Sequence, residues 1–121
     1  MTEFDKFFHA YIECALWASS DMNSEEDTSL LNLKYSIADF DKKSLRSLKK
    51  DCESFFKDNF ELISEDLERA GYDFFLTSNR HGAGFWDGDW PKEIGEKLTK
   101  ESHNYGENYF WVENGKVYCD Y

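Results

Sequence analysis

Proline is almost missing from this chain: Pro91 is the only one among 121 residues. With 40% hydrophobic and 18% aromatic residues, the chain is instead suited to a compact fold with one core, and disorder is not expected. Long apolar runs are missing too, and the first residues carry acidic charges, so we expect neither a secretory signal nor a membrane-spanning helix. The expected location is the cytoplasm.

Basic residues are the second shortage. The chain has 14 Lys and Arg against 25 Asp and Glu, a formal net charge of -11, and both halves are acidic: 12 acidic and 8 basic residues in 1–60, 13 and 6 in 61–121. This balance argues against direct binding to nucleic-acid phosphates and favours a basic protein as partner. The alternative interpretation is that the charge serves solubility alone.

Cysteine is present only three times, at Cys14, Cys52 and Cys119. The number is odd, the residues are far apart, and none has the paired spacing of a zinc or redox motif. We therefore expect reduced thiols in an intracellular protein. Cys14 and Cys52 lie on apolar faces of predicted helices, where they would belong to the core.

Helical periodicity dominates the first half of the sequence. Apolar residues recur at helical spacing over Glu3–Ser19, which predicts an amphipathic helix. A second helix is expected to begin at a cap formed by Asp39 or Asp41. A third is expected over Glu61–Ala70, with Gly71 as its left-handed C-terminal cap.

The second half contains residue types typical of strands. Residues 72–86 predict an aromatic hairpin, Pro91 begins a helix that ends near His103, and the Asn114-Gly115 pair predicts a type I′ hairpin over 109–118. The expected fold is one α+β domain over residues 1–121. Its helical part (about 3–70) would pack on a small antiparallel sheet of about four strands in the hairpin-helix-hairpin part (about 71–121), with one further helix between the two hairpins.

The expected tip of the first hairpin is polar and glycine-rich, and such tips often expose side chains for function. Trp86 and Trp90 could add an aromatic platform beside it. The candidates for binding a ligand or partner are Asn79, Arg80, His81, Gly82, Gly84, Trp86, Asp87, Asp89 and Trp90.

Three catalytic or ligand-binding interpretations of this stretch lack a complete signature. His81 could exchange protons beside Asp87 and Asp89, and with His103 the same residues could hold a metal, but the spacing is not diagnostic. The HGAG sequence lacks the Lys-Ser or Lys-Thr of a phosphate-binding loop, so its glycines are more typical of backbone roles. We therefore assign no catalytic residue, metal or cofactor.

Several short segments resemble a family of small, uncharacterised bacteriophage and prophage proteins. The resemblance covers most of the chain and lies in YIECALWAS (11–19), DCESF (51–55), AGYDFFLT (70–77), HGAGFWD (81–87), the helix at 95–99, YG (105–106) and NGKVY (114–118). The chain departs from that pattern at Ser78, where Arg is usual, and at Arg80, where Gly is usual. The resemblance implies a phage origin, and hence the host cytoplasm, rather than a mechanism.

Acidity and the phage resemblance together suggest an inhibitor that binds a basic surface of a host or defence enzyme that processes nucleic acid. We expect no membrane partner and no direct nucleic-acid contact. One alternative is a small enzyme or nucleotide-binding protein that uses residues 81–90, with a pocket lined by Trp86, His81 and Asp87. Another is a phage accessory protein in which HGAGFWD serves only the fold.

Overall fold

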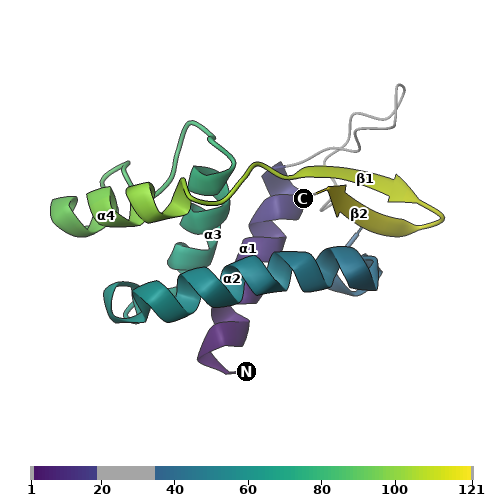
Figure 1. Cartoon of the computed structure of the whole chain (residues 1–121), viewed down its shortest axis with the longest axis horizontal. Coiled ribbons are helices and arrows are strands. Elements are labelled where there is room, and N and C mark those ends of the chain that lie inside the picture. The colour runs from purple at the N-terminus through teal and green to yellow at the C-terminus, as the bar shows by residue number, and fades with distance from the viewer. Residues whose placement is uncertain (1, 19–34, 121) are drawn as a thin grey trace.

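The most extensive contact between elements joins helix α1 (Glu3–Ala18) to helix α3 (Leu67–Ser78). The computed structural model describes residues 2–18 and 35–120. In Figure 1, α1 and α3 lie next to each other and cross behind the long helix α2 (Lys42–Ile63). The helix expected over Glu3–Ser19 is thereby confirmed as α1.

Gly71 lets α1 and α3 approach each other this closely. A Cβ atom built on Gly71 would overlap the Phe7 carbonyl oxygen and lie 2.8 Å from the Ala10 Cβ and 2.9 Å from the Tyr11 nitrogen. Two of these three neighbours are backbone atoms of α1, which cannot rotate away. The absence of a side chain at Gly71 therefore sets the distance between the two helices.

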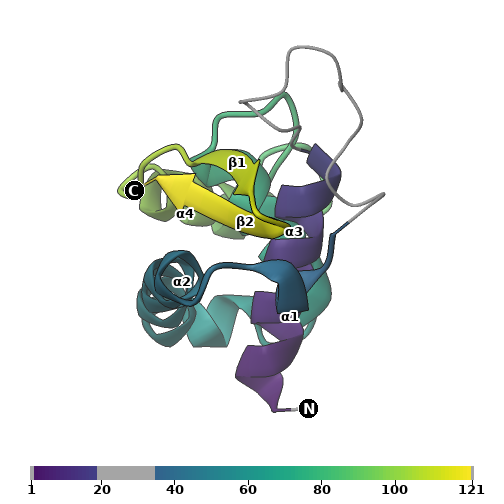
Figure 2. The same ribbon diagram turned by 90° about the vertical axis from the view of Figure 1, so that its right-hand side faces the viewer.

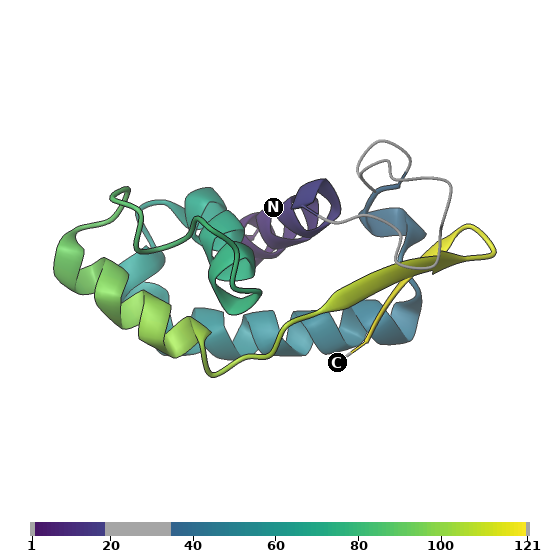
Figure 3. The ribbon, with the colours of Figure 1, turned by 90° about the horizontal axis from the view of Figure 1, so that it is seen from above.

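Helix α2 is preceded by a short 3-10 helix, η2 (Ile37–Asp39), and its N-cap is Asp41, whose Oδ2 accepts a hydrogen bond from the Ser44 nitrogen at 3.0 Å. Of the two caps expected for this helix, Asp41 is the one used. Figure 2 shows the η2 segment leading into α2 beside α1. Figure 3 shows α4 (Lys92–Ser102) next to the C-terminal end of α2 and the β hairpin over its N-terminal end.

Phenylalanine rings from four different segments form the centre of the core. Phe55 of α2 stacks on Phe74 of α3 with ring centroids 4.0 Å apart, and Phe7 of α1 lies 6.0 Å from Phe55. Phe85, from the loop before α4, lies 5.8 Å from Phe55 on another side. All four are fully buried, so this cluster ties α1, α2, α3 and the loop to one another.

The C-terminal hairpin is confirmed, with strands β1 (Tyr109–Glu113) and β2 (Lys116–Asp120) paired antiparallel. Asn114 and Gly115 have φ angles of 51° and 76°, as a type I′ turn requires. Phe110 and Val117 are buried toward the helices, while Trp111 and Tyr118 stack on each other with centroids 5.9 Å apart.

The expectation of an α+β fold with a sheet of about four strands is wrong. Within the described residues the fold is mainly helical, and its one sheet is the two-stranded hairpin. The hairpin expected over 72–86 does not exist: residues 67–78 form α3, and a loop without strands follows. Of the aromatic residues that suggested the hairpin, Tyr72, Phe74 and Phe75 lie on turns of α3, and Phe85 and Trp86 lie in the loop after it.

The expected helix over Glu61–Ala70 and its cap at Gly71 are also wrong. Helix α2 continues to Ile63, and α3 begins after Asp66, whose Oδ1 accepts a hydrogen bond from the Arg69 nitrogen at 3.2 Å. Gly71 lies in the second turn of α3 and not at a helix end. The helix expected after Pro91 is confirmed as α4.

In the part of the chain that the structure describes, every helix is too short or too polar to cross a lipid bilayer.

Replacing Gly71 with alanine should destabilise the protein. Alanine favours helices over glycine by about 1 kcal/mol, so helix propensity alone predicts a gain. Because the new methyl group overlaps backbone atoms of α1, we expect a net loss of about 2 kcal/mol, as is typical of overpacked cores.

Urea denaturation measures the difference in the free energy of unfolding between wild type and Gly71→Ala. Gly106→Ala is the control, since nothing lies within 4 Å of its added Cβ. Equal or greater stability of Gly71→Ala would contradict the packing described.

Candidate functional site

A groove of about 830 Å³ lies between α1 and α3, and η2 and the loop before α4 complete it. Buried apolar side chains such as Ile12 and Leu16 form its inner part, and exposed polar and aromatic side chains stand at its edges. We call it the α1–α3 groove. It is lined by His9, Ile12, Glu13, Cys14, Leu16, Trp17, Tyr35, Ser36, Ile37, Asp66, Glu68, Arg69, Tyr72, Asp73, Leu76, Asp87 and Asp89.

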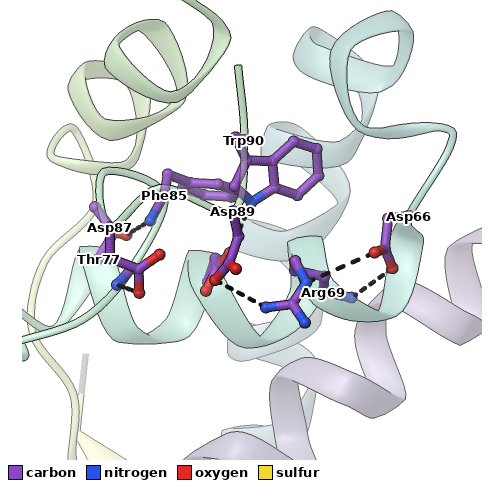
Figure 4. A network of polar contacts seen from close by, with 9 residues as sticks. Asp66, Arg69, Thr77, Phe85, Asp87, Asp89 and Trp90 are labelled. Carbon is purple, nitrogen blue, oxygen red and sulfur yellow. Dashed lines mark hydrogen bonds and ion pairs between the residues drawn. The ribbon is translucent and has the colours of Figure 1, made fainter. Parts of the chain in front are cut away.

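The α1–α3 groove is strongly anionic. Arg69 is its only guanidinium, and it pairs with Asp89 (Nη1 to Oδ2, 3.0 Å) and Asp66 (Nε to Oδ2, 3.6 Å), as Figure 4 shows. These are the only ion pairs within residues 2–18 and 35–120. Among the described residues, six carboxylates line the groove: Glu13, Asp66, Glu68, Asp73, Asp87 and Asp89. Four of them therefore have no cationic partner in the described structure.

Two aromatic side chains stand at the edge of the groove. Trp17 is 57% exposed and Tyr72 is 38% exposed. The Tyr72 hydroxyl donates a hydrogen bond to Glu13 Oε2 at 3.1 Å. Glu13 and Trp17 are four residues apart on α1 and therefore lie on the same helical face. A carboxylate and two aromatic surfaces thus occupy one edge.

Asp73 is the buried member of the acidic set. Trp90 Nε1 donates a hydrogen bond to its Oδ2 at 2.7 Å. Burial raises the pKa of Asp73 to about 6; the charges of Asp87 and Asp89 raise it further, and the Trp90 hydrogen bond and Arg69 lower it. The groove thus holds a carboxyl group that gains its negative charge only near neutral pH.

The sequence-predicted candidate Asn79 is a structural link. As the C-cap of α3, it donates from Nδ2 to the Phe75 carbonyl at 3.0 Å and accepts from the Asn108 nitrogen at 2.6 Å. The first bond closes the C-terminal end of α3, and the second fastens the residue before β1 to it. The Asn79 side-chain amide is therefore engaged within the fold.

Arg80 and His81 complete the end of α3. The His81 nitrogen donates to the Leu76 carbonyl and the Arg80 nitrogen to the Thr77 carbonyl, the two bonds of a Schellman motif. Arg80 has a φ of 59°, a conformation that favours glycine. Both side chains are exposed, and the His81 ring lies 5.8 Å from that of Phe75.

The centre of the HGAGFWD segment is anchored to α3. The Phe85 nitrogen donates to Thr77 Oγ1 at 3.1 Å, and a Cβ on Gly84 would overlap that same oxygen. The Gly84 nitrogen in turn donates to Asp87 Oδ2 at 3.3 Å (Figure 4). Glycine is therefore required at position 84 by close approach.

The remaining candidates fall into two groups. Asp87 and Asp89 line the α1–α3 groove, and Trp90 supports it through Asp73 and packs edge-on against Phe85 at 5.5 Å. Gly82 and Trp86 are exposed and lie outside the groove, with Trp86 54% exposed. The structure thus brings the acidic candidates together and leaves His81 and Trp86 apart from them.

Glu13, Trp17, Tyr72 and Asp73 were missed by the sequence prediction. One signal was available, because Glu13 and Trp17 have helical spacing within the first expected helix. Tyr72 and Asp73 carried no such signal, since they were placed on a strand that does not exist. Only the packing of α3 on α1 brings the two pairs to one surface.

Metal or thiol chemistry has little support in this groove. Among the described residues, no three His, Cys, Asp or Glu side chains gather closely enough to hold a metal ion. All three cysteines are buried, and none of them forms a disulfide in the described structure. Burial, with the nearby charge of Asp73, raises the pKa of Cys14 to about 12, so this thiol stays protonated and is a poor nucleophile.

Comparisons of the chain with models of protein families, with curated proteins and with solved structures found no match. The resemblance to phage proteins therefore remains a prediction.

Replacing Asp73 with asparagine should remove a pH-dependent destabilisation. In the unfolded chain the carboxyl has a pKa near 3.8 and in the folded protein about 6, so its contribution to stability is greatest below pH 3.8 and falls as the pH rises through 6. Asparagine stays neutral and can still accept the Trp90 hydrogen bond. Relative to wild type, the free energy of unfolding of Asp73→Asn should therefore increase by about 1 to 2 kcal/mol between about pH 4 and pH 7.5. This increase is smaller than that expected for a fully desolvated carboxylate, because water in the groove screens the charge.

Urea denaturation at a series of pH values measures this gain. Asp58→Asn, at an exposed carboxylate of α2 outside the groove, is the matched control. If the stabilities of Asp73→Asn and wild type changed in parallel with pH, the buried-carboxylate account would be wrong.

Proposed function

We propose that this protein is an acidic binding protein whose α1–α3 groove docks on a cationic surface of a partner protein. The partner class that fits best is a host or defence enzyme that processes nucleic acid, with the protein acting as a phage-encoded inhibitor in the host cytoplasm. Such an enzyme has a basic surface because its substrate is a polyanion. A protein bound there would exclude the nucleic acid.

The observation that carries this proposal is the concentration of unneutralised carboxylates in one groove. Of its six carboxylates, only Asp66 and Asp89 pair with a cation in the described structure. Complementary charge accelerates encounter and disfavours partners of the wrong sign. Exposed Trp and Tyr side chains beside the charges are the residue types that most often contribute strongly to binding.

The distribution of the basic residues supports the same proposal. The N-terminal half of α2 carries an exposed basic set, Lys42, Lys43, Arg46, Lys49 and Lys50, none of which lines the groove. This basic set therefore does not neutralise the carboxylates of the groove. A coherent anionic region remains available for a partner.

The alternative function, a nucleotide-binding site at residues 81–90, has less support. It requires a pocket lined by Trp86, His81 and Asp87, but only Asp87 lines the described groove. The contacts of Gly84 and Phe85 with Thr77 favour a role in the fold for much of the HGAGFWD segment. We therefore place the binding surface in the groove.

Neutralising the groove should abolish partner binding. Immobilised wild type should retain basic nucleic-acid enzymes from a bacterial lysate at low salt, lose them at high salt, and release them when DNA is added. The triple variant Glu13→Gln, Glu68→Gln, Asp87→Asn should retain at most about a tenth as much, because three unpaired charges worth on the order of 0.5 kcal/mol each are lost.

The control variant carries the same change in charge elsewhere: Glu53→Gln, Glu61→Gln, Glu96→Gln, all exposed and outside the groove. It should retain the enzymes as wild type does. Equal losses in the two triple variants would show that net charge, and not the groove, is responsible. No retention by wild type at either salt would refute the proposed function.

A further inference from the structure

We infer that Glu13, Trp17 and Tyr72 form a subsite for one arginine side chain of the partner. This inference rests on the proposed function, because it specifies the chemistry that the α1–α3 groove recognises. The guanidinium would lie against Glu13, with its plane on the Trp17 indole.

Glu13 is positioned but not saturated. The Tyr72 hydroxyl holds its Oε2 at 3.1 Å, which restricts the rotamers of the carboxylate. A carboxylate has about four acceptor positions, so one hydrogen bond leaves room for a second donor. No ion pair in the described structure involves Glu13. The charge is therefore oriented, exposed and available to a cation.

The aromatic face of Trp17 is the feature of the subsite that would favour arginine over lysine. A guanidinium is planar, stacks on aromatic faces and is more weakly hydrated than an ammonium group, so its desolvation on binding costs less free energy. Trp is the aromatic residue that attracts cations most strongly. With 57% of its surface exposed and Glu13 one helical turn away, Trp17 offers an open face next to an anion.

Arg69 shows that this groove already holds one guanidinium between carboxylates. Its Nη1 and Nε contact Asp89 and Asp66, which come from separate segments of the chain. Figure 4 shows Arg69 lying between these two carboxylates. The subsite at Glu13 has the same acidic character and adds an aromatic surface, but the structure shows no arginine there.

The chain's own arginines do not supply a guanidinium to this subsite. Residues 19–34, which connect α1 to Tyr35, contain four acidic residues, one Lys and no Arg. The other two arginines of the protein are Arg46, on the exposed face of α2, and Arg80, after the end of α3, and neither lines the groove. A guanidinium bound at this subsite would therefore come from another molecule.

Three synthetic peptides of about ten residues test this inference. They share one sequence of alternating cationic and leucine positions and differ only in carrying arginine, lysine or citrulline at each cationic position. Isothermal titration calorimetry with the full chain measures the dissociation constants. The arginine peptide should bind at least about 5-fold more tightly than the lysine peptide, and the neutral citrulline peptide should not bind measurably.

Two variants locate the arginine, each with a matched control. Trp17→Leu and Glu13→Gln should each weaken binding of the arginine peptide by about 5- to 10-fold. Trp86→Leu removes an equally exposed tryptophan outside the groove, and Glu96→Gln removes an exposed charge on α4; both should change binding by less than about 2-fold. Circular dichroism tests whether each variant is folded. If Trp17→Leu does not fold, the affinity of Glu13→Gln decides the test.

The inference is overturned if lysine and arginine peptides bind equally, if neither binds, or if the control variants lose as much affinity as the subsite variants. Equal binding of both cationic peptides, lost in the groove triple variant, would leave the proposed function intact and remove only the preference for arginine. Retention of nucleic-acid enzymes from lysate tests the proposed function separately, because it does not depend on these peptides.

Discussion

The fit of the α1 backbone against Gly71 is the contact on which the rest of this structure depends. Because Gly71 has no side chain, the Phe7 carbonyl and the Tyr11 nitrogen can lie against α3. This approach aligns the two helices so that Glu13 and Trp17 of α1 stand beside Tyr72 of α3. The phenylalanine cluster then fixes α2 and the loop before α4 to the pair, and the groove is the surface that remains between them.

Electrostatic repulsion acts between the carboxylates that line the groove. Carboxylates from α1, α3 and the loop converge there, and burial together with the charges of Asp87 and Asp89 raises the pKa of Asp73. The fold offsets part of this repulsion through Arg69 and through the Trp90 hydrogen bond. A cationic partner would relieve the rest, so binding and the release of unfavourable charge contacts are linked. Sites that are strained or destabilised in this way are typical of functional surfaces.

Local patterns predicted α1, α4 and the β1–β2 hairpin, because helical periodicity and the Asn114-Gly115 turn are signals within short segments. The prediction wrongly assigned a strand to the residues after Gly71. Helical spacing runs through the whole of α3, at Leu67, Ala70, Gly71, Phe74, Phe75 and Ser78. The aromatic residues outweighed this spacing in the prediction, although the strand preference of aromatic residues depends strongly on context. Two of the predicted candidates, Asp87 and Asp89, both line the groove. Their neighbours Glu13 and Tyr72 come from distant segments, so no local pattern could bring them to the same groove.

A two-dimensional amide NMR titration tests the central claim most directly, because it shows where a cationic partner binds without assuming which residue matters. Addition of the arginine peptide to the labelled protein should shift amides of the C-terminal half of α1, of α3 around Tyr72 and of the loop at Asp87. Amides of α4 and of the β1–β2 hairpin should stay in place. Shifts spread evenly over all acidic surfaces, or concentrated at His81 and Trp86, would contradict the account.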